Sequence, residues 1–196
     1  MLEWHSGGAV ASNYEAICEE NQRRYGTEGA QKSGELAADL YDDRTHFIFE
    51  LLQNAEDALG RRGDWQGPRK VTFALASTRL TLSHFGKPFD EADVRSVCDI
   101  AESTKNESSI GRFGLGFKSV YTVTDLPSIH SGDEDFAIED YVFPKRTDRT
   151  LREADETQII PPRRPAAKRL GPSFGVSCER MGQARRVSHR WAYPDR

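Results

Sequence analysis

The sequence lacks any long apolar run, since no stretch of its 196 residues approaches twenty consecutive hydrophobic side chains. A membrane-spanning helix needs about 20 such residues. The first residues, MLEWHSGGAV, have neither the basic lead nor the apolar centre of a secretory signal. From the sequence we therefore expect a cytoplasmic protein without a membrane anchor.

Cysteine is also scarce, with three in the whole chain. Cys18, Cys98 and Cys178 are widely separated and lack the close spacing of metal ligands. We expect neither a disulfide framework nor a zinc site, and we expect these thiols to be reduced and mostly buried.

A large net charge is absent, but the charge is unevenly distributed. The chain has 27 Lys and Arg against 31 Asp and Glu, and residues 161–196 hold nine of the basic and two of the acidic residues. The acidic body makes nucleic-acid binding by the domain unfavourable. The basic, Pro- and Arg-rich end can make weak polyanion contacts and is typical of a disordered tail. We expect a flexible N-terminus at 1–12, one domain at 13–160 and the tail at 161–196.

The stretch 47–59, FIFELLQNAEDAL, is typical of a helix with one polar and one apolar side. At about 100° per residue, Glu50, Asn54 and Asp57 fall within one narrow arc. The apolar side chains expected to form the buried side, opposite that arc, are Ile48, Leu52, Ala55 and Leu59. Such a helix is either amphipathic and solvated or part of a site, and these residues alone leave both readings open.

Other elements follow from the same periodicities. We expect a helix from Asn13 to Tyr25 that stops at Gly26, strands at 71–76 and 80–85 joined by a turn, and a helix from residue 90 or 91 to 100. A helix followed by an antiparallel hairpin favours an α+β fold, with helices on one face of a mixed, mostly antiparallel sheet.

A glycine-rich stretch, IGRFGLGFKSVY, follows the polar loop 101–109. Gly111, Gly114 and Gly116 permit the close backbone approach that an anion cradle requires. Residues 117–123 then continue as a helix or a strand into the core. Turns and close helix packing use glycine as readily, so the trio by itself also fits a structural role.

Together, ELLQNAEDA and IGRFGLGFKSVY resemble the two signature boxes of the GHKL ATPases. The wording THFIFELLQNAEDA, GKPF and STK is most similar to the sacsin-like branch, whose ATPase domain resembles that of the heat-shock chaperones. The resemblance covers about Asn13 to Ile160 and implies the Bergerat fold, a two-layer α/β sandwich that binds Mg-ATP between the central helix and the glycine-rich loop.

The resemblance also implies roles for the central helix. Glu50 matches the general base that acts on the attacking water, and contacts the metal through that water. Asn54 matches the asparagine that binds Mg²⁺, and Asp57 matches an acidic residue that supports the nucleotide. Phosphoryl transfer requires positioning and charge neutralisation more than covalent chemistry, and these residue types agree with that need.

Further contacts to the nucleotide are implied by the second box and the loop before it. Lys118 either reaches a phosphate or is an exposed lysine. Ser103 to Lys105 match a lid that closes over ATP. The residues implied to bind the nucleotide in this region are Ser103, Thr104, Lys105, Gly111, Gly114, Leu115, Gly116, Phe117 and Lys118.

The sequence departs from the family where an aspartate recognises the adenine amino group. His84 and Gly86 are the equivalents in place, and Asp93 is a less favoured substitute for the acid. A histidine accepts a hydrogen bond only when it is neutral with a free ring nitrogen. His84 fits equally well a strand residue packed at the edge of the sheet.

A second departure concerns the end of the domain. Thr157 begins a pattern that in the family touches phosphate, but after Ile160 no segment has the periodicity of a strand. We expect either a truncated or frameshifted reading, or a natural short variant, with an incomplete sheet.

The expected function is an ATP-binding module that hydrolyses ATP slowly to drive conformational change in a chaperone-like or larger multidomain protein. A protein client or the parent protein's other domains would be its partners. The alternative is a nucleotide-binding or interaction module without turnover. A histidine kinase is disfavoured, because no phosphoacceptor histidine stands on an adjoining helical hairpin.

Overall fold

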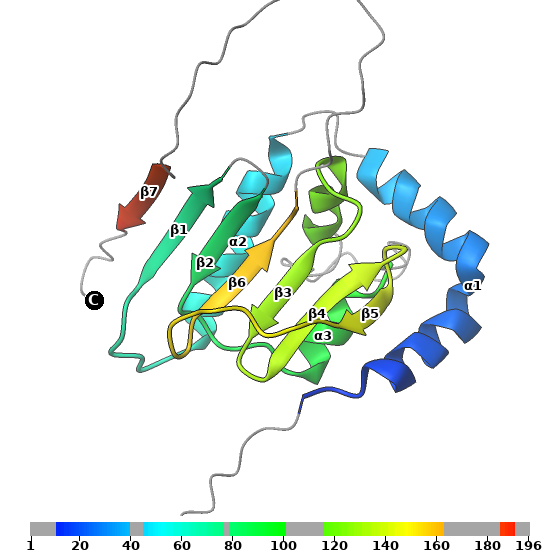
Figure 1. Ribbon diagram of the computed structural model, residues 1–196, viewed down its shortest axis with the longest axis horizontal. Coiled ribbons are helices and arrows are strands. Elements are labelled where there is room, and N and C mark those ends of the chain that lie inside the picture. Colours follow the sequence, from blue (N-terminus) through cyan, green and yellow to red (C-terminus); the bar gives the residue numbers. More distant parts are fainter. Residues whose placement is uncertain (1–10, 40–44, 77–78, 101–115, 163–184, 191–196) are drawn as a thin grey trace, which may run out of the picture.

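A computed structural model describes residues 11–39, 45–76, 79–100, 116–162 and 185–190 of the chain. These residues form an α+β fold with helices packed against a sheet (Figure 1). The helices are α1 Tyr14–Asp39, α2 His46–Arg61, α3 Glu91–Val97 and the 3₁₀ helix η1 Lys118–Thr122. The strands are β1 Lys70–Leu75, β2 Leu80–His84, β3 Ser128–Ser131, β4 Glu134–Glu139, β5 Phe143–Arg146, β6 Thr157–Ile160 and β7 Arg185–Arg190.

The sheet has the order β5-β4-β3-β6-β2-β1-β7, and each of these pairings is antiparallel. The hairpin β1–β2 and the meander β3–β4–β5 are local in sequence, whereas β6 lies between them and joins β2 to β3. The expected sandwich is therefore confirmed, with an antiparallel sheet.

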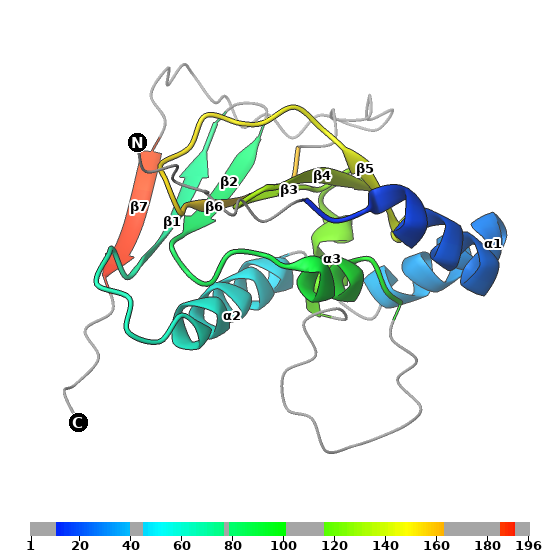
Figure 2. The same ribbon diagram turned by 90° about the horizontal axis from the view of Figure 1, so that it is seen from below.

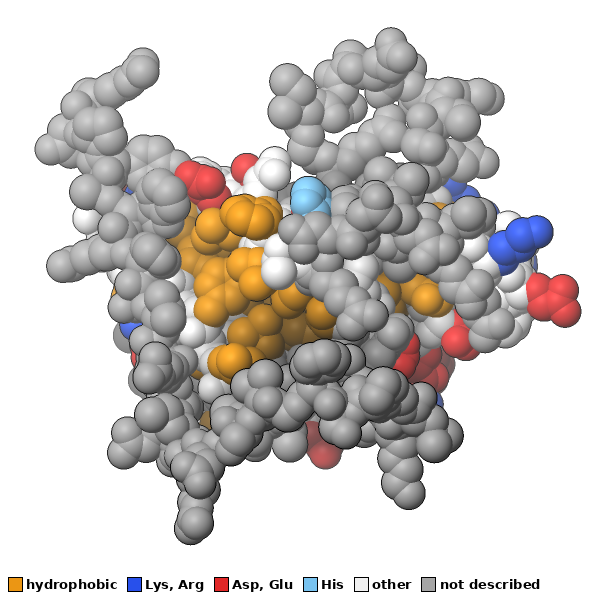
Figure 3. Space-filling view, turned by 90° about the horizontal axis from the view of Figure 1, so that it is seen from above, with side chains coloured by type: hydrophobic (Ala, Val, Ile, Leu, Met, Phe, Trp, Pro, Cys, Tyr) orange, Lys and Arg blue, Asp and Glu red, His pale blue; other side chains and the backbone are white. Residues whose placement is uncertain are grey.

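The helices α2 and α3 lie on one side of the sheet, and α1 lies beyond β5 (Figure 2). The core between the layers is apolar, with Leu51, Leu82 and Ile129 at 0% exposure. Seen from above Figure 1, hydrophobic side chains gather on one face of the molecule (Figure 3).

The buried side of α2 differs from the sequence prediction. The buried residues are Phe47, Leu51, Ala55 and Ala58. Of the predicted set only Ala55 is buried, while Ile48, Leu52 and Leu59 are partly buried against the core. The reason is that the apolar arc of this helix is wider than one face, and the sheet covers the half nearer to Glu50 and Asn54. The polar arc therefore borders the buried side instead of opposing it.

The predicted break at Gly26 is present, but the helix does not stop there. Gly26 has φ 62° and ψ 171° inside α1, so two helical segments meet at a kink, and the second continues to Asp39. Backbone of this kind is open to glycine and strained for other residues.

The prediction of no strand after Ile160 is wrong at one place, because β7 pairs with β1 over six residues. Its sequence, RRVSHR, lacks the apolar alternation that identifies half-buried strands. Charged residues are common on edge strands of sheets. A strand of this composition is therefore not recognised from its hydrophobic pattern.

Two expectations from the scarcity of apolar runs and cysteines can be compared with the structure. Within the described residues, no helix is long and apolar enough to cross a membrane. Cys98 is buried and Cys18 partly buried, both as free thiols. Burial raises the pKa of the Cys98 thiol to about 12. Cys178 lies outside the described residues.

Candidate functional site

Glu50 and Gly116, far apart in the sequence, meet in the structure. Glu50 projects from α2, and its side chain is 22% exposed. Gly116 lies just before η1, and a β-carbon at this position would overlap Oε2 of Glu50. Glycine permits this close approach, and with a larger residue here the carboxylate of Glu50 would have to shift. The helix box and the last glycine of the glycine box therefore lie side by side.

His46 holds the other oxygen of the same carboxylate. Its Nε2 lies 2.8 Å from Oε1 of Glu50, one helical turn further along α2. The sequence reasoning missed His46, although its place four residues before Glu50 on a predicted helix was a usable signal. The carboxylate is thus fixed from two sides while part of it stays accessible.

Asn54 and Asp57 continue the same arc of α2 toward solvent. Asn54 is partly exposed and Asp57 is exposed. Within the described residues, the Asn54 amide makes no hydrogen bond with another side chain or the backbone. Amide and carboxylate oxygens are the ligands that Mg²⁺ prefers, so this side of α2 has suitable, accessible oxygens.

Gly86 fixes the turn after β2 against α2. A β-carbon on Gly86 would lie 2.6 Å from the carbonyl carbon and the β-carbon of Ala58. The backbone N–H of Lys87 donates to the carbonyl of Ala58 at 2.8 Å. Arg62, at the end of α2, donates to the carbonyls of Phe85 and Gly86 at 2.8 and 3.2 Å. This turn is therefore held rigidly on the helix that carries Glu50.

His84 lies inside the sheet, which excludes the predicted position at its edge. It is 2% exposed, and its strand β2 pairs with both β1 and β6. The backbone N–H of Gly86 donates to its Nδ1 at 3.0 Å. Burial, with the nearby Arg61 and Arg62, lowers the pKa of His84 to about 4. The ring is neutral at physiological pH, and the nitrogen that accepts is already occupied.

Lys118 is not the exposed lysine that the sequence left open. Its side chain is fully buried, and Nζ donates to the carbonyls of Val97 and Tyr141 at 2.7 and 2.5 Å. Burial lowers the pKa of this ammonium group to about 8. The lysine therefore links η1 to the end of α3 and to the residues after β4, and it is not exposed.

Thr157 and Asp93 both have partners within the fold. Thr157 is fully buried, faces His84 across the β2–β6 ladder, and its Oγ1 lies 2.5 Å from Oγ of Ser131. Asp93 pairs with Arg61 at 2.9 Å and completes the capping box of α3. Both carboxylate oxygens of Asp93 are thus engaged within the fold.

The remaining predicted residues divide into two groups. Phe117 is 1% exposed and belongs to the core at the start of η1. Those that lie outside the described residues are Ser103, Thr104, Lys105, Gly111, Gly114 and Leu115.

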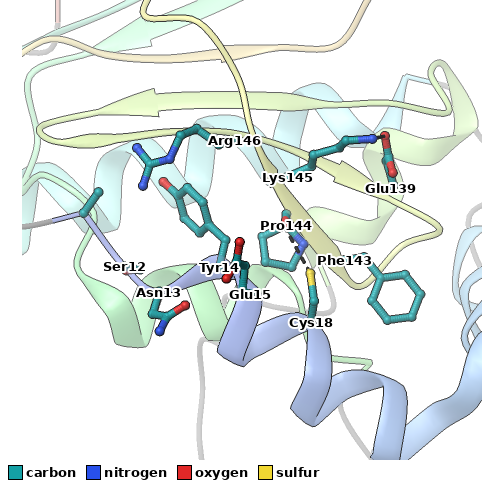
Figure 4. A pocket seen from close by; sticks show the side chains of 11 residues that line it. Ser12, Asn13, Tyr14, Glu15, Cys18, Glu139, Phe143, Pro144, Lys145 and Arg146 are labelled. Atoms are coloured by element: carbon teal, nitrogen blue, oxygen red, sulfur yellow. Dashed lines mark hydrogen bonds and ion pairs between the residues drawn. The ribbon is translucent and has the colours of Figure 1, made fainter.

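A separate cavity of about 750 Å³ lies between the start of α1 and β5 (Figure 4). Its lining includes Glu15 and Cys18 of α1, and the thiol of Cys18 donates to the carbonyl of Pro144 at 3.2 Å. In the described parts of the chain, no group of three His, Cys, Asp or Glu side chains is arranged to hold a metal ion. A metal at Glu50 and Asn54 would thus depend on oxygens from a ligand.

Comparisons with known proteins find one family model and several longer relatives. A family model described as "Sacsin domain" matches residues 81–157. The protein NO VEIN of Arabidopsis thaliana is 40% identical over 98 residues, which cover 49% of this chain and 4% of that protein. Human Sacsin is 34% identical over 112 residues, covering 51% of this chain and 2% of its own length.

A bacterial protein is similar over a longer stretch. The chaperone protein HtpG of Aliarcobacter butzleri is 27% identical over 138 residues, or 56% of this chain and 22% of that protein. The chain therefore spans a small part of each of these relatives. Together with the fold, the matches support a sacsin-like, HtpG-like domain.

Proposed function

We propose that this domain binds Mg-ATP at the arc of α2 that carries Glu50, Asn54 and Asp57, and hydrolyses it slowly. The observation that carries the proposal is the meeting of Glu50 with Gly116. A carboxylate fixed against glycine backbone and still partly exposed is suited to act on a water molecule beside a phosphate.

The side chains present fit a magnesium-bound nucleotide. Asn54 would hold the metal through its amide oxygen, and Glu50 would contact it through water. Magnesium would neutralise the charge of the phosphates when bound. The exposed Asp57, one turn further along α2, would support this arrangement through water or backbone.

In hydrolysis, Glu50 would take the proton of the attacking water. As the oxygen of that water bonds to the γ-phosphorus, the bond to the leaving ADP oxygen breaks, and the proton passes to the carboxylate. The N–H of His46 would keep one carboxylate oxygen occupied, so that the other faces the water.

The relatives suggest what turnover would serve. HtpG is a chaperone protein by its printed name, and the chain matches a small part of a much longer protein in each comparison. We infer that turnover drives conformational change in a cytoplasmic, chaperone-like or multidomain assembly, whose client or companion domains are its partners.

A second candidate is a module that binds nucleotide without turnover. The observation in its favour is that His84 replaces the aspartate expected from the family. Weak or altered base binding would then leave the nucleotide badly placed for chemistry.

The first experiment is isothermal titration of the whole chain with a non-hydrolysable ATP analogue, with and without Mg²⁺. We expect magnesium-dependent binding that Asn54→Ala weakens about tenfold or more. Gln53→Ala, an exposed neighbour on α2, is the matched control and leaves binding unchanged. A folded protein that binds no nucleotide would overturn both candidate functions.

Phosphate release separates the two candidates. We expect slow wild-type turnover that Glu50→Ala abolishes while the analogue still binds. Absence of turnover in a wild-type protein that binds Mg-ATP would favour the second candidate.

A further inference from the structure

The two edges of the sheet differ in what lies beside them. At one edge, α1 lies beyond β5, and the thiol of Cys18 donates to the carbonyl of Pro144 at 3.2 Å. The Asn21 amide of the same helix donates to the carbonyl of Val142 at 2.8 Å. At the other edge, β7 is the last strand of the sheet and lies beside β1 (Figure 1). The first edge is therefore closed by a helix, whereas the second ends in one added strand.

The core-facing side of β1 is incompletely covered. Phe73 is partly buried against the core and pairs with Leu82 of β2, which is 0% exposed. Alternate residues of a strand share a face, so Val71 and Leu75 belong to the same side of β1. Val71 is 3% exposed, but Leu75 is 55% exposed. Apolar surface therefore remains open along β1 toward Leu75, although β7 is in place.

The sequence of β7 matches this side of β1 poorly. The β7 positions that stand opposite Leu75, Phe73 and Val71 in the register are Arg185, Val187 and His189. Positions on the core-facing side of an antiparallel sheet are normally apolar. Of these three positions, one is apolar.

The charges at the far end of the same ladder are also mismatched. Lys70 of β1 and Arg190 of β7 stand directly opposite each other. Like charges at such positions are destabilising. Lys70 makes no ion pair within the part of the chain that the structure describes, and its ammonium group lies 5.4 Å from the centre of the Phe85 ring. An acidic residue opposite Lys70 would replace this repulsion with attraction.

The pairing of β7 with β1 thus rests mainly on the backbone ladder. Another extended segment can form the same ladder, because its hydrogen bonds join main-chain groups alone. Cross-strand side-chain pairs then decide which segment is preferred. The preferred segment is apolar opposite Val71, Phe73 and Leu75, and acidic opposite Lys70.

We propose that the edge of β1 now paired with β7 is a strand-addition site for an extended segment of a partner protein with this preferred pattern. β7 occupies the edge when the partner is absent and is displaced when the partner pairs. Strand addition takes its affinity from main-chain hydrogen bonds and its specificity from alternate side chains. This site is independent of nucleotide binding.

Two short peptides with a fluorescent label test the proposal. One has the sequence of β7, RRVSHR, and the other is IRVSVE, which differs from it opposite Leu75, Val71 and Lys70. Fluorescence anisotropy measures the binding of each to the whole chain. We expect IRVSVE to bind about tenfold more tightly or better, because three cross-strand pairs improve.

An exchange of charge checks the register. A third peptide, IRVSVK, places a lysine opposite Lys70 and should bind more weakly than IRVSVE. In Lys70→Glu the order of these two peptides should reverse. Arg69→Glu makes the same change just outside the ladder, so it is the matched control and should keep the original order. An order that Lys70→Glu does not reverse would contradict the proposed register.

Competition with β7 is tested by changing β7 itself. Val187→Pro should strengthen the binding of IRVSVE, because proline is disfavoured within a sheet strand. A triple variant, with Arg185→Ile, His189→Val and Arg190→Glu, has the preferred residues in the chain's own strand. It should unfold at a higher temperature than the wild type and bind IRVSVE more weakly. This variant keeps the test decisive if Val187→Pro does not fold, which far-UV circular dichroism would show.

The remaining outcomes separate other roles for this edge. Equal affinities for RRVSHR and IRVSVE, or a triple variant no more stable than the wild type, would overturn the proposal and leave β7 as a fixed, charged edge strand. Dimerisation of Val187→Pro that excludes the peptide would overturn it in favour of a second copy of this chain. Size-exclusion chromatography with light scattering measures that dimerisation.

Discussion

The Glu50 carboxylate is the residue on which the candidate chemistry depends, and His46 is its most direct partner. If His46 orients Glu50 for catalysis, His46→Ala should lower kcat by about tenfold or more with little change in nucleotide affinity. His46→Gln, which retains an N–H donor, should recover part of the rate. Steady-state phosphate release with direct titration measures both, and equal losses in kcat and affinity would contradict the assignment.

Lys118 gives the fold a pH dependence of predictable sign. Its folded pKa of about 8 is below the ordinary 10.5, so between these values the unfolded chain binds a proton that the folded chain does not. Stability should therefore rise with pH from about 8. Above about 9 the buried Cys98 opposes this, because its raised pKa keeps the folded thiol protonated while the unfolded thiol ionises.

Urea unfolding of the whole chain across this pH range measures the effect. Lys118→Met should remove the rise between pH 8 and 9, and Cys98→Ala should extend the rise toward pH 10.5. An unchanged slope in Lys118→Met would show that other groups are responsible.

Neither the burial of Lys118 nor the ring state of His84 was predictable from the sequence. Lysine is almost never fully buried without partners, and the partners here are two carbonyls at the ends of other elements. The tautomer of His84 depends on a single backbone N–H in the following turn. By contrast, Glu50, Asn54 and Asp57 were predictable as a group, because helical spacing alone places them together.

At the scale of elements, two phenylalanines of α2 differ strongly in exposure and so show which side of the helix is buried. Phe47 is 6% exposed and Phe49 is 65% exposed, although both are apolar and two residues apart. Phe47→Ala should lower the free energy of unfolding by about 3 kcal/mol or more, while Phe49→Ala should change it by about 0.5 kcal/mol or less. Chemical denaturation of the two variants compares them directly, and similar costs would contradict the orientation of α2.

The contact between α2 and the turn after β2 can be tested with two glycines. A methyl group at Gly86 meets the backbone of α2, so Gly86→Ala should destabilise the fold by about 1–3 kcal/mol. Gly60, inside α2, has nothing within 4 Å of an added β-carbon, and Gly60→Ala should stabilise by about 0.5–1 kcal/mol. Thermal or urea unfolding would record opposite signs, and equal signs would refute this packing.

The positions of α2, α3, β1 and β2 were predictable because each has a clear periodicity and a turn signal beside it. The covered side of α2 was not, since its apolar residues span a wider arc than the sheet covers. The sequence did not predict β7, because a strand can pair with an existing sheet edge through its backbone without an alternating apolar pattern.

Across the whole molecule, segment 147–156 connects distant parts of the fold. Arg152 pairs with Asp135 of β4 at 2.7 Å, and Asp155 pairs with Arg62 after α2 at 2.7 Å. The first pair is almost fully buried, with side chains 4% and 10% exposed, whereas Asp155 is 46% exposed.

These two pairs should contribute very differently to stability. Asp135→Ala leaves the guanidinium of Arg152 buried without its main partner, so we expect a loss of about 3–5 kcal/mol. Asp155→Ala removes an exposed carboxylate and should cost about 1 kcal/mol or less. Differential scanning calorimetry of both variants measures the difference. Comparable losses would show that the buried pair contributes no more to stability than the exposed pair.

The position of β6 has a consequence for how the protein is made. This strand is encoded after β1 to β5, yet it lies between β2 and β3 and supplies the ladders that join the hairpin to the meander. During synthesis on the ribosome, the two earlier groups of strands therefore emerge with open edges toward each other. Until Ile160 has left the exit tunnel, the nascent chain is two separate pieces of sheet, and this interval is when it most needs protection from association with other chains.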